Sequence, residues 1–292
     1  MKKTKERKKI LVTGGFGFLG SHVVDSLESA GHSVIIFDSK KSANIKSGSD
    51  FINGDILDLE ALTKALKNID VVFHLAAFSD LNKAQDNPID TMKVNVVGMT
   101  NVLEAARINK INRVIFSSSI YVSSRTGGFY RVSKHSCELL LEEYFNRFDL
   151  KYTILRFGTL YGTRSDSSNS VYNYLKDALL KGEIQAIGSG EEIREYIDVR
   201  DAADFCVEVL ADKYEGETLV LTGQHRMRLA ELLEMISEIL DNKVNIEYGR
   251  GKNAHYKYTP YSYNPKPGKK IVLDSFRDMG QGLVEILEEI DN

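Results

Sequence analysis

A tyrosine and a lysine near the middle of the chain have the spacing that proton transfer requires. Tyr130 and Lys134 are four residues apart, so on a helix they lie on one face, one turn apart. An ammonium group beside a phenol stabilises the phenolate and lowers the tyrosine pKa towards neutrality. Tyr130 could then take a proton from a hydroxyl group or return one, and Ser119 could hydrogen-bond the same oxygen. These three residues are the candidate catalytic residues.

The pattern Tyr-x-x-x-Lys is common on amphipathic helices, so its meaning depends on the elements around it. Near the start of the chain, the apolar run 10–12 is typical of a buried parallel strand, and 21–30 indicates a helix. Gly14, Gly17 and Gly20 lie between them. We expect a tight turn at Gly14, close backbone approach at Gly17 and close helix packing at Gly20. A pyrophosphate group could then lie against the N-terminus of the helix.

An acidic residue after the second predicted strand supports a dinucleotide site. Asp38 follows the strand 33–37 and lies 18 positions beyond Gly20, where a carboxylate can bind a ribose 2′-hydroxyl. A carboxylate there repels a 2′-phosphate, so Asp38 favours NAD as the cofactor. Lys40 and Lys41 follow closely and keep NADP open as an alternative. A positively charged nicotinamide ring would lower the pKa of Tyr130 further.

The order of elements predicts an α/β fold. Further strands are expected at 51–53, 70–75, 113–116 and 152–156, alternating with helices at 57–66, 88–109 and 129–148. This alternation predicts a Rossmann-type, doubly wound parallel sheet with ligands at the carboxyl ends of its strands. The pattern changes after Arg156. We therefore expect an NAD-binding domain over 1–160 and a smaller C-terminal α/β, mainly substrate-binding domain over 161–292, with some segments returning to the main sheet.

Composition narrows the class of protein. The chain has 292 residues, 42% of them hydrophobic, and a net charge of −3, which argues against nucleic acid or an anionic membrane as a partner. No stretch is long and apolar enough to span a bilayer, and no signal-peptide pattern follows the basic start. Cys137 and Cys206 lie in apolar surroundings, so structural thiols are expected, together with a cytoplasmic location. We predict no metal site.

Taken together and in order, these motifs resemble an extended short-chain dehydrogenase/reductase of the nucleotide-sugar epimerase and dehydratase group. The resemblance covers nearly the whole chain and rests on these stretches: Thr13–Gly20, Asp38, Asp55-Ile56, His74–Ala77, Asn95–Gly98, Ser117–Ser119, Tyr130–Lys134, Leu155-Arg156 with Tyr161-Gly162, and Arg194–Asp198.

The resemblance implies a role for each of these residues. Ser119, Tyr130 and Lys134 match the catalytic residues, and Lys134 would also hold the nicotinamide ribose. The implied NAD-binding residues are Gly14, Gly17, Phe18, Leu19, Gly20, Asp38, Asp55, Ile56, Leu75, Ala76 and Ala77. The implied binding residues for a nucleotide-sugar substrate are Ser79, Ser119, Thr159, Arg194 and Arg250. Arg194 would bind the diphosphate through the N–H donors of its planar guanidinium. The alternative is that Arg194 forms a surface salt bridge. Asn95 would be structural or lie near the cofactor.

Departures from the family pattern bear on the reaction. Dehydratases and sugar-acid decarboxylases of the group carry acids directly after the catalytic Ser/Thr, whereas this chain has Ile120 and Tyr121. The segment between Ser119 and Tyr130 is short, Thr159 replaces a usual asparagine, and Arg250 is a poor match to a late Arg-Pro-Gly element. The tyrosine-rich stretch 256–263 could replace part of the substrate cover.

The leading hypothesis is an NAD-dependent nucleotide-sugar epimerase acting at C4 of a UDP-glucose/galactose-like substrate through a transient 4-keto intermediate. One alternative is an NAD(P)H-dependent 4-ketosugar reductase or dehydrogenase, and another is a non-catalytic nucleotide-binding regulator. The resemblance also implies a homodimer that forms through a bundle of the helices 88–109 and 129–148.

Overall fold

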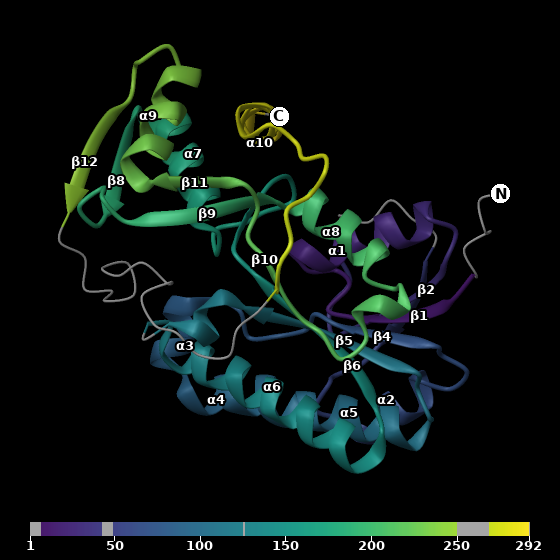
Figure 1. The fold of residues 1–292 in the computed structure, drawn as a ribbon. Helices are drawn as coiled ribbons and strands as arrows, with labels where there is room; N and C mark the ends of the chain where they lie inside the picture. The colour runs from purple at the N-terminus through teal and green to yellow at the C-terminus, as the bar shows by residue number, and fades with distance from the viewer. Residues whose placement is uncertain (1–6, 43–48, 125, 250–268, 292) are drawn as a thin grey trace.

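The computed structural model describes residues 7–42, 49–124, 126–249 and 269–291. Its main layer is an eight-stranded sheet in which every pairing is parallel (Figure 1). Across the sheet the strands are β13 (Lys269–Lys270), β10 (Thr218–Leu221), β6 (Lys151–Phe157), β5 (Arg113–Ser119), β4 (Val71–His74), β1 (Lys9–Thr13), β2 (Ser33–Asp38) and β3 (Asp50–Asn53). From β1 the chain builds the sheet outwards through β2 and β3 on one side, and then through β4, β5 and β6 on the other side. This reversal between β1 and β4 confirms the doubly wound sheet predicted from sequence.

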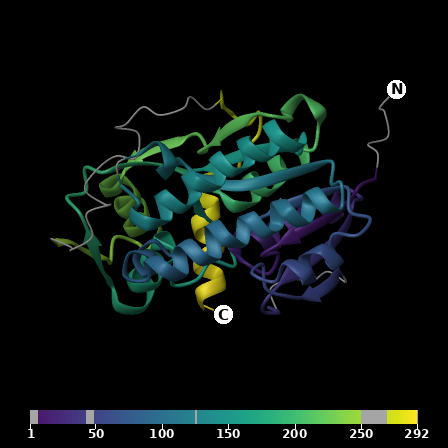
Figure 2. The same ribbon diagram turned by 90° about the horizontal axis from the view of Figure 1, so that it is seen from below.

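Helices cover both faces of this sheet. On one face α1 (Phe18–Ser29) packs beside α8 (Val199–Glu208), and their apolar side chains share a core with β1, β2 and β10. The other face carries α2 (Leu59–Ala65), α5 (Gly98–Ile108) and α6 (Gly128–Phe148), which form a second core with β1, β2, β4, β5 and β6. Figure 2 shows this second layer of helices turned towards the viewer. The short helices α3 (Leu81–Asp86) and α4 (Pro88–Met92) lie against α6.

The C-terminal part builds a smaller unit on the carboxyl side of the sheet. A three-stranded sheet contains β7 (Thr159–Tyr161), β9 (Ile193–Asp198) and β11 (His225–Arg228), and β8 (Glu183–Ile187) pairs with β12 (Asn245–Gly249). A third core joins these strands to α7 (Ser170–Lys181), α9 (Leu229–Ile239) and α10 (Met279–Asp291). Because β10, β13 and α8 belong to the main sheet and its helix layer, the chain crosses between the two units several times.

Several element boundaries differ from the sequence predictions. The helix expected over 88–109 contains a π-helical turn, η1 (Lys93–Val97), between α4 and α5. Strand β9 ends at Asp198, because the Asp198 side chain accepts a hydrogen bond from Arg200 N and caps α8, which starts at Val199. Ser117–Ser119 belong to β5 itself. Two short 3-10 turns, η2 (Ile120–Ser123) and η3 (Asp212–Tyr214), complete the described elements.

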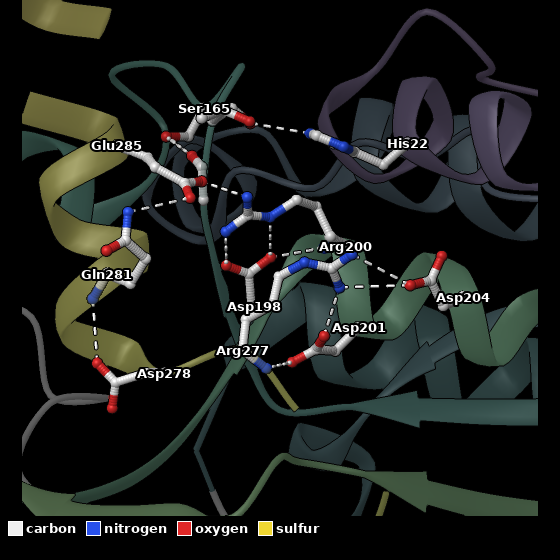
Figure 3. Close-up of polar contacts among 12 residues, drawn as sticks. His22, Ser165, Asp198, Arg200, Asp201, Asp204, Arg277, Asp278, Gln281 and Glu285 are labelled. Atoms are coloured by element: carbon white, nitrogen blue, oxygen red, sulfur yellow. Dashed lines mark hydrogen bonds and ion pairs between the residues drawn. The ribbon is translucent and has the colours of Figure 1, made fainter. Parts of the chain in front are cut away.

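An ion-pair network ties the two units together (Figure 3). Arg200 of α8 forms a bidentate pair with Asp198, with distances of 3.0 and 2.8 Å, and also pairs with Glu285 of α10. Arg277 pairs with Asp201 and Asp204 further along α8. The C-terminal helix is therefore anchored by charge to a helix that covers the main sheet.

Two further sequence predictions concern single residues and membrane segments. Cys137 and Cys206 are both buried and free, as predicted for structural thiols.

Within the described ranges, no helix has the length and apolar character needed to cross a membrane. The tyrosine-rich stretch 256–263 lies outside the described residues.

Candidate active site

A large cleft of about 890 Å³ opens where the carboxyl ends of the parallel strands face the smaller unit. Every site residue predicted from sequence lines it, apart from Arg250, which lies outside the described residues. The lining residues are Gly14, Gly17, Phe18, Leu19, Gly20, Asp38, Asp55, Ile56, Leu75, Ala76, Ala77, Ser79, Ser119, Tyr130, Lys134, Thr159 and Arg194. The fold thus brings together residues that are up to 180 positions apart in the chain; their individual roles remain predictions.

The glycine turn between β1 and α1 is built as the sequence predicted. Gly14 has a φ of +69°, which L side chains rarely adopt, and its N–H donates to Phe37 O at 3.0 Å. A Cβ atom at Gly20 would lie 2.0 Å from Gly14 O, so only glycine allows α1 to begin this close to the strand. Because no side chain caps α1 at Gly17, the first N–H groups of the helix remain available to a bound anion.

A carboxylate acceptor lies in the wall of the cleft in addition to the free N–H groups of α1. The Asp38 carboxylate accepts hydrogen bonds from Phe16 N and Lys40 N, both at 3.1 Å, and these hold it at the edge of the cleft. Asp55 and Ile56 lie beside it in the cleft wall. The uncapped helix end and this carboxylate fit the pyrophosphate and the adenosine ribose of NAD, respectively.

The three candidate catalytic residues meet where β5 and α6 approach each other. Ser119 ends β5, while Tyr130 and Lys134 lie one turn apart on α6. The Lys134 side chain is buried, and its Nζ donates a hydrogen bond to Ser117 O at 2.7 Å. The same ammonium lies 4.7 Å from the ring centroid of Phe116 and 5.7 Å from that of Tyr130. Lys134 is therefore fixed between the strand and the tyrosine.

The pKa of Tyr130 differs from the sequence prediction. The sequence predicts that Lys134 lowers this pKa, whereas burial of the phenol raises the pKa of Tyr130 well above its ordinary value. Desolvation of the phenolate is the largest cause, and the Lys134 ammonium faces the ring of Tyr130 while it donates to Ser117 O. Burial also lowers the pKa of Lys134 to about 8. The protein alone therefore keeps Tyr130 as a phenol at neutral pH, with a charged lysine beside it.

Asn95 supports this region from the π-helical turn η1. Its Oδ1 accepts a hydrogen bond from Phe78 N at 2.6 Å, and its Nδ2 donates to Ser133 Oγ at 2.8 Å. Asn95 is buried and does not line the cleft. It therefore holds the segment after Ala77 against the helix that carries Tyr130 and Lys134.

The opposite wall of the cleft comes from the smaller unit. Arg194 of β9 is 7% exposed, and the one hydrogen bond that its side chain makes within the described part of the chain goes to the neighbouring Ile193 O at 3.1 Å. No carboxylate there pairs with it, so the surface salt bridge considered as an alternative does not form among the described residues. A buried guanidinium that faces a cleft without a counter-ion suits an anionic ligand. Thr159 and Ser79 line the cleft as well.

Sequence reasoning missed several residues of this wall. Asn169, Tyr174, Glu192 and Leu229 all line the cleft. Asn169 accepts hydrogen bonds from the N–H groups of residues 171 and 172, and a polar residue before an apolar helix is typical of such a cap, which by itself indicates no binding site. Glu192 is held by the N–H groups of residues 189 and 190. Nothing in the local sequence around these residues indicates that they face β5 and α6.

A parallel sheet with a glycine turn and a Ser–Tyr–Lys group at its carboxyl edge defines a class of dinucleotide-binding α/β enzymes. Residues 10–221 match the model of the NAD dependent epimerase/dehydratase family, and the chain belongs to this family.

The relatives cover more than one reaction. The chain is 32% identical over 223 residues to a UDP-glucose 4-epimerase of Mycolicibacterium smegmatis, covering 67% of this chain and 71% of that protein. It is 25% identical over 302 aligned positions to a UDP-N-acetyl-alpha-D-glucosaminuronate decarboxylase of Bacillus cytotoxicus, covering 94% and 92%. The structure of Thermotoga maritima UDP-glucose 4-epimerase with UDP-glucose matches with a TM-score of 0.83 and 26% identity over 97% of this chain and 98% of that chain. The chain is thus an enzyme of the NAD-dependent epimerase/dehydratase family, and these relatives are named for two different reactions.

Proposed function

We propose that this chain is an NAD-dependent epimerase that inverts a nucleotide sugar of the UDP-glucose/galactose type at C4 through a transient 4-keto intermediate. The observation that carries the proposal is the Ser119, Tyr130 and Lys134 group in the cleft, followed by Ile120 and Tyr121, neither of which is an acid. Elimination of water or loss of carbon dioxide needs further acid–base groups beside the sugar. Transfer of a proton and a hydride at a single carbon needs none beyond these three.

The chain's own residues would transfer the proton and orient the sugar. Tyr130 would exchange a proton with the C4 oxygen, and Ser119 would hydrogen-bond that same oxygen. The ammonium of Lys134 would stabilise negative charge that develops on the phenol. NAD, when bound, would supply both the acceptor and the donor for the C4 hydride, so the overall reaction would be redox-neutral. Inversion results because the ketone is turned in the site before the hydride returns.

The substrate would bind across the two units. Arg194 would bind the diphosphate, because its guanidinium is buried in the wall of the cleft opposite the glycine turn and no carboxylate of the described chain neutralises it. Ser79 and Thr159 would contact the sugar nucleotide from the same cleft. In this proposal, residues 1–160 mainly bind NAD. Residues 161–292 mainly bind substrate, apart from β10, β13 and α8.

We also propose that the protein is a homodimer. The helices over 88–109 and 129–148 form the outer layer seen in Figure 2. They expose large apolar side chains, among them Ile89, Val97, Val132 and Leu139, with exposed fractions of 79, 50, 40 and 48%. A second copy of the same layer would bury these side chains in a four-helix bundle.

A turnover assay without added cofactor tests the proposed reaction. Purified protein is incubated with UDP-galactose, and the formation of UDP-glucose is followed by chromatography. We expect an equilibrium mixture, no net NADH and release of NAD on denaturation. Tyr130→Phe should abolish turnover, whereas Tyr144→Phe, on the same helix but outside the cleft, should leave it intact.

Other products would point to another reaction. Stoichiometric consumption of NADH or NADPH on a 4-keto sugar nucleotide would favour the reductase alternative. Formation of a dehydrated or decarboxylated sugar would contradict the epimerase proposal.

A further inference from the structure

A buried ion pair lies behind the candidate catalytic residues and has no part in the proposed chemistry. Glu138 of α6 and Arg156 of β6 have side chains that are 2% and 3% exposed. The Arg156 guanidinium donates from Nε to Glu138 Oε1 at 2.9 Å and from Nη2 to Oε2 at 2.6 Å. Ser118 Oγ donates a third hydrogen bond to Oε1 at 2.5 Å. The carboxylate is thus held by donors from two different strands.

Two members of this cluster, Ser118 and Glu138, are adjacent to candidate catalytic residues. Ser118 directly precedes Ser119 on β5. Glu138 follows Lys134 by one helical turn, so Tyr130, Lys134 and Glu138 form one stripe along α6. Arg156 lies beside Ser118 in the register of β5 with β6. One carboxylate therefore connects the helix of the tyrosine and lysine to the strand of the serine.

Packing alone would not require charged groups here. Burying a carboxylate and a guanidinium costs desolvation, and apolar side chains of similar volume often stabilise a core equally well. An apolar contact, however, tolerates sliding and rotation of a helix, whereas a bidentate ion pair fixes both direction and distance. The cluster is therefore better suited to fixing the register of α6 than to adding stability.

We infer that Glu138, held by Arg156 and Ser118, is a positioning residue that aligns α6 with β5 so that Tyr130 and Lys134 face Ser119. The inference rests on the proposed function, because it concerns the groups that would transfer the proton. It assigns to Glu138 no contact with substrate or NAD, and accordingly Glu138 does not line the cleft.

The test compares Glu138→Gln with Glu142→Gln in the NAD-loaded protein. Glutamine keeps the shape of Glu138 but removes its charge and one acceptor oxygen, so α6 should shift slightly against β5. We expect kcat, per mole of folded protein that contains NAD, to fall about 100-fold. KM for the nucleotide sugar and the NAD content should change less than about threefold, because these depend on Arg194 and the glycine turn. Glu142 is half-buried one turn further along the same helix, so its variant controls for the substitution itself.

A spectroscopic measurement keeps this test independent of the substrate. In protein labelled with [13Cζ]tyrosine, the Tyr130 resonance is assigned with Tyr130→Phe. We expect it to move in Glu138→Gln and to stay in place in Glu142→Gln, whether or not any nucleotide sugar is turned over. A wild type that is inactive on every sugar tested would therefore refute the proposed function and leave the positioning role testable.

Ser118→Ala provides a milder variant in case Glu138→Gln does not fold. It removes a single hydrogen bond to the carboxylate, so we expect kcat to fall about fivefold, with a smaller shift of the Tyr130 resonance. The inference is overturned if the folded variants lose thermal stability but keep kcat within about twofold and an unmoved Tyr130 resonance. In that case Glu138 would have a structural role alone.

Discussion

The Nζ atom of Lys134 donates a hydrogen bond to the carbonyl oxygen of Ser117, 2.7 Å away, inside the protein. This contact joins α6 to β5 at the point where Ser119 ends the strand. It also determines what the lysine can do. The ammonium faces the ring of Tyr130 and not a carboxylate, and burial lowers the pKa of Lys134 to about 8.

The lowered pKa predicts an alkaline limit for activity. Below about pH 8 Lys134 is charged and can stabilise negative charge on Tyr130, and above that pH it is increasingly neutral. We therefore expect kcat to fall as pH rises through about 8, measured from initial rates with saturating nucleotide sugar. A rate that stays constant to about pH 10, near the ordinary lysine value, would contradict the prediction.

Asp38→Asn should change the choice of cofactor. Phe16 N and Lys40 N donate to different oxygens of Asp38, so the single asparagine oxygen can keep only one of these two hydrogen bonds. Removing the negative charge abolishes the repulsion of a 2′-phosphate, with Lys40 and Lys41 nearby in the cleft wall. The preference for NAD over NADP should fall about tenfold or more, measured as the ratio of the two dissociation constants. An unchanged ratio would show that Asp38 does not face the ribose.

The contrast between the two walls of the cleft shows what could be predicted from sequence. The glycine turn and Asp38 are local features, because a strand, a turn and a helix follow one another within 30 residues. Lys134 and Tyr130 are likewise placed by the period of one helix.

The other wall depends on contacts between distant segments. The short strands β7 and β11 form only because both pair with β9, and this pairing brings Arg194 and Asn169 to the cleft. The raised pKa of Tyr130 could not be predicted either, because desolvation depends on how completely other segments bury the ring. Sequence spacing identifies which groups are neighbours but not how much water reaches them.

Arg200→Gln should loosen the attachment of the C-terminal helix. Arg200 pairs with Asp198, whose side chain is completely buried, and with Glu285 of α10 (Figure 3). The substitution leaves the Asp198 carboxylate buried without its bidentate partner, so the free energy of unfolding in urea should fall by about 2 kcal/mol. Lys213→Gln, which breaks an exposed pair with Glu208, should have no measurable effect. Equal effects of the two variants would show that the network does not anchor the helix.

Tyr121→Phe should weaken substrate binding more than the chemical step. Tyr121 lines the cleft, and its N–H donates to Ser119 Oγ at 3.2 Å. Its hydroxyl has no hydrogen-bond partner within the described ranges, so it remains available to a sugar hydroxyl. We expect KM to rise about fivefold with kcat within about twofold, since the backbone contact to Ser119 is retained. A kcat loss as large as that of Tyr130→Phe would instead place Tyr121 in proton transfer.

Leu139→Glu should disrupt the proposed dimer. Leu139 lies on the outer side of α6 with 48% of its surface exposed, so a charge there has no effect on the core of a monomer. In a dimer built on this layer, the same charge would be buried without a partner and would oppose association. Light scattering coupled to size exclusion should give about twice the monomer mass for the wild type and the monomer mass for the variant. Leu180→Glu, on α7 and 64% exposed, is the matched control and should remain dimeric. If the wild type is itself a monomer, or if only Leu180→Glu dissociates, the interface does not lie on the helices 88–109 and 129–148.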